Sequence, residues 1–198
     1  MTAGLTIYPA AAKFVDMAAR EASARGVPLP IVLGTIAVES RFKERAYRAE
    51  PHIGDASRGL MQLLYRTAQG LGYTGPPEGL YDPAVNIALG TQYLADGIAR
   101  YPNDVWAAVS RYNNGHGRRA TKVTTTCRWR KPDGTCGESF TAQPGEFLNQ
   151  PYVDDVRAAA ELFGLGDGDP LAAGLASGPL GAVILLGILG ALARRQFT

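Results

Sequence analysis

Apolar residues near the start of the chain recur at the three- and four-residue spacing of an amphipathic helix. This helix is expected to begin at Pro9, since proline suits the first helical position, and to end at Gly26. A second helix, from Ile31 to Arg41, is predicted by a run that is nearly all apolar. Because its apolar residues occur all round the helix, we expect it to be buried. The apolar positions of the first helix are Ala11, Phe14, Val15, Ala18 and Ala22.

Helical patterns alternate with polar loops through the next hundred or so positions. Residues 49–58 predict a loop or a short hairpin. Asp82 and Pro83 combine an N-cap with a proline at the first helical position, so a helix is expected to start there. Residues 120–147 are polar and rich in threonine, and we interpret them as irregular or β structure. The helices predicted in this part of the chain cover residues 59–68, 82–100, 105–112 and 152–163.

The C-terminal segment differs in composition from the rest. Residues 166–170 are typical of a linker. Residues 171–193 carry no charge, and as a helix they would span roughly 35 Å, against about 30 Å of membrane hydrocarbon. We therefore predict a transmembrane helix, followed by a basic end at 194–198. The alternative is a helix buried in an oligomer, which the small residues Gly174 and Gly178 would favour.

Composition narrows the class of protein. The chain has 198 residues, 46% of them hydrophobic, enough for one domain and an appendage. A net charge of +2 is too small to indicate nucleic-acid binding. The basic residues between positions 118 and 131 are interpreted as a solvated loop face, with a rim for an anionic wall polymer as the alternative. The first residues lack the pattern of a secretory signal. His52 and His116 lack metal-ligand spacing, so no metal or cofactor is expected.

The two cysteines, Cys127 and Cys136, flank the sequence Pro132-Asp133-Gly134. Such a turn folds a strand back on itself. Two cysteines are too few for an ordinary structural zinc site. A hairpin disulfide and a pair of free thiols remain, and the redox compartment decides between them. We expect the disulfide if the domain works outside the cytoplasm.

Four short motifs and one further segment follow one another in a fixed order. They are Glu39-Ser40, Gly59-Leu60-Met61-Gln62, the segment Leu80 to Ile87 with Asn86, Tyr112-Asn113-Asn114-Gly115, and Tyr152-Val153. Together they resemble the soluble lytic transglycosylases, relatives of goose-type lysozyme that cleave peptidoglycan glycan strands. The resemblance extends from about Phe14 to about Phe163. It implies a mainly α-helical, lysozyme-like domain over residues 1–165, with a small β or loop insertion at 116–147.

Glycosidic cleavage needs an acid that is still protonated near neutral pH, which an apolar setting favours. Glu39 ends a strongly apolar segment and fits this need, although pairing with Arg41 or Lys43 would be its simplest role in isolation. The resemblance implies that Glu39 is the single catalytic acid and that Ser40 supports the site. Glu39 would protonate the bond between N-acetylmuramic acid and N-acetylglucosamine. It would then activate the muramic 6-hydroxyl, which gives a 1,6-anhydro product without consuming water.

The resemblance also implies supporting roles for other motif residues. In the cleft, Gly59 would let the backbone approach the sugar, Met61 would make a pliable apolar contact, and Gln62 would offer a donor and an acceptor. Tyr112 would bond to the catalytic carboxyl and Asn113 to an N-acetyl group. Simpler structural interpretations are core packing, turns and caps. The remaining residues assigned to the site are Asn86 and Tyr152, the latter closing the cleft.

The predicted function is peptidoglycan lytic transglycosylase, with glycan strands as substrate. One alternative is a goose-type muramidase in which Asp55 positions water, although a turn cap is the simpler role for Asp55. Another is an inactive glycan-binding or structural component of a virion or secretion machine. The domain and its tail suit a phage virion protein that opens the host wall during genome entry. Expected partners are the membrane, virion proteins or further copies of the chain, and no nucleic acid.

Overall fold

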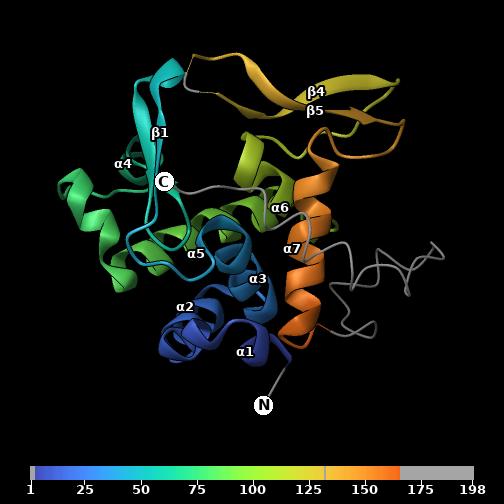
Figure 1. Ribbon diagram of the computed structural model, residues 1–198. Coiled ribbons are helices and arrows are strands. Elements are labelled where there is room, and N and C mark those ends of the chain that lie inside the picture. Colours follow the sequence, from blue (N-terminus) through green and yellow to red (C-terminus); the bar gives the residue numbers. More distant parts are fainter. Residues whose placement is uncertain (1–2, 132, 166–198) are drawn as a thin grey trace.

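Two helices, α3 (Leu29–Ser40) and α7 (Gln150–Leu162), pack side by side (Figure 1). The structure is a computed structural model, and it describes residues 3–131 and 133–165. Gly34 allows this approach, because a Cβ there would lie 2.9 Å from backbone atoms of Val156 and Ala160. Every residue of α3 from Ile31 to Ser40 is buried, which confirms the prediction of a buried helix.

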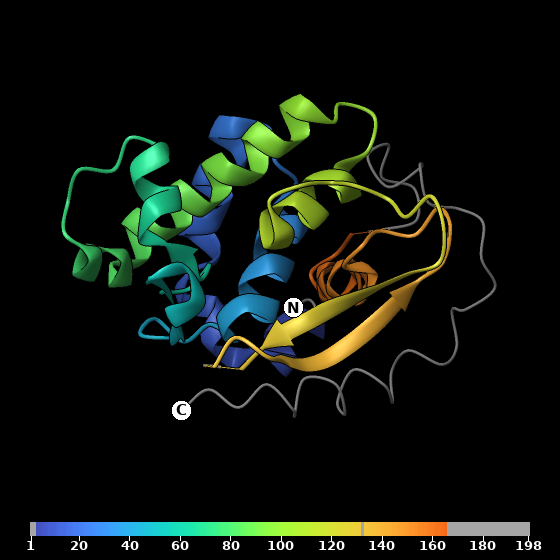
Figure 2. The same ribbon diagram turned by 90° about the horizontal axis from the view of Figure 1, so that it is seen from above.

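The other helices surround this pair, so the domain is mainly helical as predicted (Figures 1 and 2). The longest of them, α5, packs against α2 and α6. The core between the helices contains Trp106, Phe147, Ile36 and Leu60, each at most 1% exposed. The bounds are α1 Ala3–Ile7, α2 Val15–Arg25, α4 Tyr65–Gly70, α5 Pro83–Arg100 and α6 Val105–Asn114, with 3-10 helices η1 Pro9–Lys13, η2 Pro51–Ile53 and η3 Pro77–Tyr81.

Several residues that were predicted to begin or end a helix do so in the structure. Asp82 Oδ1 accepts hydrogen bonds from Ala84 N at 2.8 Å and Val85 N at 3.2 Å, and α5 begins at Pro83. Gly26 ends α2 in the left-handed region, with φ of 65°. The helix predicted from Pro9 onward is interrupted at Phe14, whose buried ring packs against core aromatic residues.

The helix predicted over residues 59–68 is wrong in its first half. Gly59 and Gln62 adopt left-handed backbone conformations, with φ of 76° and 48°. The chain therefore turns sharply and then forms the short strand β3 (Leu63–Leu64), and α4 begins only at Tyr65. Local apolar spacing could not reveal this turn, because distant polar groups hold it in place.

The strands form two small antiparallel sheets. The first has the order β1-β2-β3, with β1 (Tyr47–Glu50) and β2 (Asp55–Arg58) joined through η2, which confirms the hairpin predicted near residues 49–58. The second pairs β4 (Thr124–Arg130) with β5 (Cys136–Ala142) inside the stretch predicted as irregular or β. A disulfide joins Cys127 to Cys136, with their Cα atoms 5.6 Å apart, so the hairpin disulfide is confirmed.

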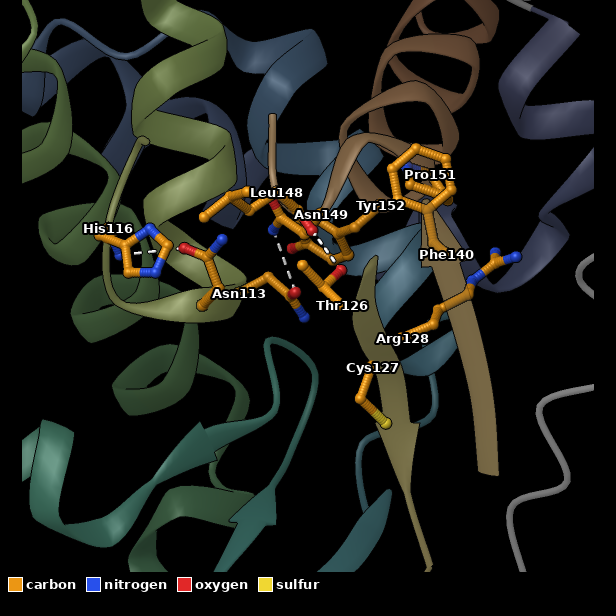
Figure 3. A pocket seen from close by; sticks show the side chains of 11 residues that line it. Asn113, His116, Thr126, Cys127, Arg128, Phe140, Leu148, Asn149, Pro151 and Tyr152 are labelled. Carbon is orange, nitrogen blue, oxygen red and sulfur yellow. Dashed lines mark hydrogen bonds between the residues drawn. The ribbon is translucent and has the colours of Figure 1, made fainter. Parts of the chain in front are cut away.

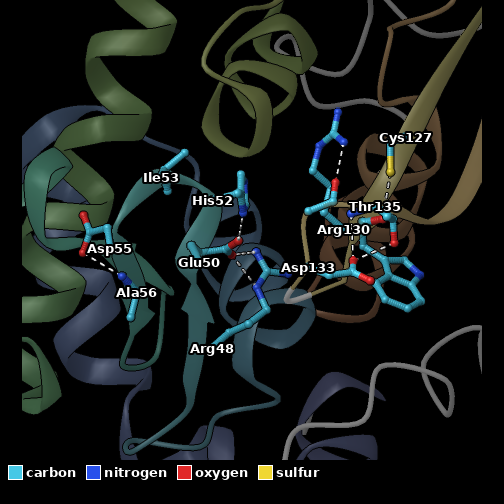
Figure 4. Close-up of polar contacts among 12 residues, drawn as sticks. Arg48, Glu50, His52, Ile53, Asp55, Ala56, Cys127, Arg130, Asp133 and Thr135 are labelled. Atoms are coloured by element: carbon cyan, nitrogen blue, oxygen red, sulfur yellow. Dashed lines mark hydrogen bonds and ion pairs between the residues drawn. The ribbon is translucent and has the colours of Figure 1, made fainter.

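The tips of the two hairpins lie close together at one end of the molecule (Figures 1 and 4). A Cβ on Gly134 would lie 3.9 Å from the Cβ of His52. Internal polar contacts shape each tip. Glu50 pairs with Arg48, and Asp133 accepts hydrogen bonds from the backbone and hydroxyl of Thr135 at 2.9 and 2.6 Å. The β4–β5 hairpin therefore extends from the α6–α7 side of the domain to the β1–β2 hairpin.

The predicted linker at 166–170, the predicted membrane helix at 171–193 and the basic end at 194–198 lie outside the described residues. Within residues 3–131 and 133–165, none of the helices has the length and apolar character needed to cross a membrane.

Candidate active site

Glu39 lies in the last turn of α3, and its side chain is enclosed by the surrounding helices. The residue is only 8% exposed. The helix ends just beyond it, because Arg41 and Phe42 adopt left-handed conformations with φ of 54° and 61°. Such conformations are costly for residues other than glycine and must be held by the surrounding packing. The buried carboxyl is thus fixed at a sharp bend in the chain.

Tyr152, in the first turn of α7, contacts this carboxyl directly. Its hydroxyl donates a hydrogen bond of 2.7 Å to Glu39 Oε1, and the tyrosine is 3% exposed. The contact follows from the close packing of α3 against α7. A hydrogen bond to a carboxylate oxygen stabilises the charged form of the acid and fixes its orientation.

Tyr112, on α6, does not make the hydrogen bond to the carboxyl that the sequence predicted. Its hydroxyl instead donates to the backbone oxygen of Met61 at 2.8 Å. Burial raises the pKa of Tyr112 well above its usual value, and the negative charge of Glu39 raises it further. Tyr112 therefore lies within electrostatic reach of Glu39 and remains a neutral donor.

The turn from Gly59 to Gln62 is built around Asn86, a fully buried residue of α5. The Asn86 side chain accepts from Met61 N at 2.7 Å and donates to the backbone oxygens of Arg58 and Leu80 at 3.0 and 2.8 Å. A Cβ on Gly59 would collide with Asn86 and with the Leu80 carbonyl. Asn86 is thus the internal support of the turn, and Gly59 leaves space for the Asn86 side chain.

Two other motif residues face the protein interior instead of a cleft. The Met61 side chain, which we expected to contact the substrate, is fully buried beside Gly90. Ser40 is also fully buried, and its hydroxyl donates to Ile36 O of its own helix at 3.2 Å. Met61 contributes its backbone carbonyl to Tyr112, and Ser40 contributes to the packing of α3.

Gln62 has one amide atom engaged and one available. Its Nε2 donates to the backbone oxygens of Ala46 and Gly59 at 3.0 Å each, which ties the turn to the segment before β1. Its Oε1 is buried and has no hydrogen-bond partner among residues 3–131 and 133–165.

Asp55 is occupied by structural hydrogen bonds. Its carboxylate accepts from Tyr65 N at 3.3 Å and Arg66 N at 3.1 Å, the first residues of α4, and from Ala56 N at 2.7 Å. Burial acts to raise the pKa of Asp55, but these backbone donors and the Arg58 guanidinium outweigh it and lower that pKa below its usual value. Asp55 caps α4, as a helix N-cap carboxylate does.

Asn113 lies at the rim of a small cavity, with Asn149 and His116 beside it (Figure 3). Asn149 Nδ2 donates to Asn113 Oδ1 at 3.1 Å and to Ser110 O at 3.1 Å, and Asn149 Oδ1 accepts from Ser110 Oγ at 2.6 Å. Asn149 was not predicted from the sequence, and His116 was considered only as a metal ligand and rejected. Neither has a local signal beyond the position of Asn149 just before α7.

Across the part of the chain that the structure describes, no group of three or more His, Cys, Asp or Glu side chains could hold a metal ion. The site contains one buried carboxyl with a phenol donor at hydrogen-bond distance. Such a pair can give a proton to a leaving oxygen and take one from an attacking hydroxyl.

Residues 16–130, more than half of the chain, match the family described as the Transglycosylase SLT domain. The chain belongs to this family. The SLT match contains Glu39, Asn86 and Tyr112, and it ends at the last residue of β4. Tyr152 lies beyond the SLT match, and the packing of α7 on α3 brings it to Glu39.

Three curated relatives of this SLT domain share one name. The chain is 32% identical over 121 residues to Membrane-bound lytic murein transglycosylase C of Actinobacillus pleuropneumoniae serotype 5b, covering 54% of this chain and 32% of that protein. The protein of the same name from Haemophilus ducreyi is 33% identical with the same coverage. That from Shigella sonnei is 31% identical over 119 residues, covering 53% and 32%. The chain thus spans about a third of the length of these relatives.

A solved structure shares the fold. The lytic transglycosylase Slt of Pseudomonas aeruginosa, solved as an inactive mutant, superposes with a TM-score of 0.58 at 23% sequence identity. The alignment covers 79% of this chain and 24% of that chain. The SLT domain described here therefore has the same helical architecture.

Proposed function

We propose that this SLT domain is a peptidoglycan lytic transglycosylase and that Glu39 carries the reaction. The observation that supports it most directly is the buried Glu39 carboxyl with the Tyr152 hydroxyl 2.7 Å away. The relatives named lytic murein transglycosylase point to the same substrate, because murein is peptidoglycan.

In the proposed reaction, Glu39 first donates its proton to the oxygen between N-acetylmuramic acid and N-acetylglucosamine. The bond from that oxygen to the muramic C1 breaks as the positive charge develops on the sugar. The ionised Glu39 then takes the proton of the muramic 6-hydroxyl, and the oxygen of that hydroxyl bonds to C1. The product is a 1,6-anhydro sugar, Glu39 ends protonated as it began, and no water is used. One titrating residue suffices, whereas ordinary glycoside hydrolysis uses two carboxyl groups.

The other residues at the site would hold this acid and the substrate. Tyr152 fixes the orientation of the carboxyl. Tyr112 and Asn86 hold the Gly59–Gln62 turn in place, so that the free Gln62 Oε1 can accept a hydrogen bond from the glycan.

The test is the substitution Glu39→Gln together with product analysis. Glu39→Gln keeps the shape of the side chain and removes the proton, so soluble fragments should no longer be released from purified peptidoglycan. Mass spectrometry of the wild-type digest should show fragments lighter by one water than the hydrolysis products. Release by Glu39→Gln at the wild-type rate would contradict the assignment. Reducing-end muramic acid as the main product would instead favour a muramidase.

We further propose a setting for this activity. Residues 171–193 are uncharged and are followed by Arg194 and Arg195, which supports a membrane helix whose C-terminus remains on the inner face. The catalytic domain would then face the peptidoglycan. A wall-cutting domain on such a tail suits a virion protein that opens the host wall locally during genome entry, where it would associate with other virion proteins or further copies of itself.

A further inference from the structure

The tips of the β1–β2 and β4–β5 hairpins touch each other (Figure 4). His52 lies in η2, between β1 and β2, and Gly134 lies in the turn between β4 and β5. A Cβ on Gly134 would lie 3.9 Å from the Cβ of His52, which is ordinary van der Waals distance. Across residues 3–131 and 133–165, no hydrogen bond or ion pair joins the two tips. The tips are therefore in contact without being bonded to each other.

This tip contact completes a closed ring of protein that includes Glu39. The chain leaves α3 just after Glu39 and leads through β1 to the tip at His52. On the other side of the tip contact, β4 returns to α7, where the Arg128 guanidinium donates to the Asp155 carboxylate at 3.0 Å. The ring closes at the start of α7, where the Tyr152 hydroxyl donates to Glu39. The two hairpins therefore connect the parts of the domain on either side of the catalytic carboxyl.

The β4–β5 hairpin faces the catalytic pair. Thr126 of β4 and Phe140 of β5 line the same cavity as Tyr152, the donor to Glu39 (Figure 3). A glycan strand that reaches Glu39 on this side runs between the hairpin and the end of α3. Such a strand passes through the ring that the hairpin tips close.

The β4–β5 hairpin has a firmly held base and an irregular outer part. In the base, the Thr126 hydroxyl donates to Leu148 O at 2.7 Å, beside the ion pair from β4 to α7. The strand pairing then shifts register on both sides of Trp129, as in a β-bulge. A bulge interrupts the ladder and lets the strand bend. The disulfide from Cys127 to Cys136 holds the two strands together across this point, so the outer part can move without its strands separating.

Each tip is complete without the other. In the β1–β2 tip, Glu50 pairs with Arg48 at 2.6 Å and lies 3.8 Å from His52. In the β4–β5 tip, Asp133 accepts from the backbone and hydroxyl of Thr135. Parting the tips therefore breaks van der Waals contact and none of these polar contacts. Elements with so few contacts open at a low free energy.

We propose that the β4–β5 hairpin is a strap across the catalytic site, which opens at its tip to admit a glycan strand from the side and then rests on the bound strand. The proposal rests on the transglycosylase function proposed above. The muramic residues of peptidoglycan carry peptides, and neighbouring strands are joined through these peptides. A strand that bears such groups is stopped by a closed ring and does not thread through it end-on. A bond within the strand therefore reaches Glu39 when the tips at His52 and Gly134 part.

The test locks the two tips together. Disulfides join Cβ atoms about 3.5–4.5 Å apart, and the Cβ positions of His52 and Gly134 are 3.9 Å apart. The double variant His52→Cys with Gly134→Cys should therefore form a disulfide on oxidation, and peptide mapping by mass spectrometry identifies it. The matched control is His52→Ser with Gly134→Ser, which carries the same backbone strain at Gly134, with φ of 83°, and has no thiol.

The measurement is the release of soluble fragments from purified peptidoglycan before and after a reductant is added. We expect the locked protein to lose this activity and the reductant to restore it to the level of the equally reduced serine control. The serine control should cleave under both conditions. Cleavage by the locked protein at the rate of the control would overturn the proposal, because the strand would then reach Glu39 with the tips joined. Failure of the folded cysteine variant to form the bond would also overturn it, since the tips would not be in contact.

Hydrogen exchange tests the strap without new cysteines, should the double variant not fold. In the Glu39→Gln protein, the backbone N–H groups of Trp129, Arg130 and Cys136 should exchange more slowly when soluble peptidoglycan strands are bound, because the outer part of the hairpin then rests on the strand. Exchange at these positions that is unchanged by bound strands would contradict the strap.

A binding experiment separates the strap from the proposed reaction. The cysteine pair is placed in the Glu39→Gln protein, and the association rate of soluble strands is measured with the tips locked and after reduction. We expect the lock to slow association. If the wild-type chain cuts no peptidoglycan while the lock still slows association, the transglycosylase function fails and the strap is supported. If the wild-type chain cuts peptidoglycan and the lock changes neither association nor cleavage, the strap alone is overturned.

Discussion

Glu39 and Tyr152 are 113 residues apart in the sequence, yet their side chains share a hydrogen bond of 2.7 Å. The hydroxyl of Tyr112, the other tyrosine assigned to the site, donates to the Met61 carbonyl. These two tyrosines therefore have different roles at the same site. Tyr152 acts on the acid itself, and Tyr112 acts on the turn that lies beside it.

This difference predicts separate effects of removing each hydroxyl. Tyr152→Phe should lower the cleavage rate about tenfold, because a hydrogen bond to a charged group contributes about 1.5 kcal/mol or more. Tyr112→Phe should mainly lower the free energy of unfolding, by about 1–3 kcal/mol, because it leaves a buried carbonyl unpaired, with a smaller loss of rate. Rates and urea unfolding curves of both variants are the measurements. A larger rate loss in Tyr112→Phe, at equal folded fraction, would contradict these roles.

The second prediction concerns Asp55. The pH dependence of the unfolding free energy tests whether Asp55 acts as a helix cap. The pKa of Asp55 is lowered in the folded protein, so its stabilising effect is complete above the unfolded pKa of about 3.9 and is lost as pH falls through the lower folded value. Asp55→Asn should therefore unfold more easily than wild type at pH 7. The difference in unfolding free energy should shrink toward pH 3.

The same Asp55→Asn variant also tests the muramidase alternative. Because Asp55 caps α4, the variant should still release 1,6-anhydro products from peptidoglycan at a rate close to wild type. Mass spectrometry of the digest is the measurement. Loss of cleavage with an unchanged unfolding curve would show that Asp55 takes part in the reaction.

At the scale of secondary-structure elements, the β4–β5 hairpin depends on its disulfide for closure. Replacing Cys127 and Cys136 by serine should remove up to about 2–3 kcal/mol of stability, by the entropy of the short loop that the bond closes. Because the disulfide joins β4 to β5, its loss should let the strands separate more often, and we expect trypsin to cut after Arg128 and Arg130 faster in this variant. Mass spectrometry of timed digests measures it. Equal cutting rates in both proteins would show that the strand pairing alone holds the hairpin.

Elements whose conformation is determined by neighbouring residues could be predicted from the sequence. Elements whose conformation depends on residues far away in the chain could not. Asp82 and Pro83 start α5, and the turn between the cysteines forms a hairpin, because each signal acts within a few positions. The turn at Gly59 was wrongly predicted as helix, because it is held by Asn86, 25 residues from Met61. The cavity was missed for the same reason, since its walls come from the hairpin, α6 and α7.

At the scale of the whole molecule, the candidate site combines parts that are far apart in the chain. Glu39 comes from α3, the Gly59–Gln62 turn from the β2–β3 connection, Tyr112 from α6 and Tyr152 from α7. The α3–α7 contact brings the first and last of these together, and Gly34 keeps that contact close. The site therefore forms only when the whole helical domain folds.

Residues 171–193 predict that the 198-residue chain inserts into membranes. They carry no charge, and as one continuous helix they would be roughly 35 Å long, against about 30 Å of hydrocarbon, whereas a straight helix from Leu180 to Ala193 alone would be too short to span it. Full-length protein should therefore float with liposomes, whereas a chain truncated after Asp169 should stay in the soluble fraction. Leu186→Arg in the full-length chain is the matched control and should reduce flotation, because a charge in the hydrocarbon is costly. Equal flotation of the full-length and truncated chains would rule out membrane insertion, and association of full-length protein without lipid would favour an oligomerisation helix.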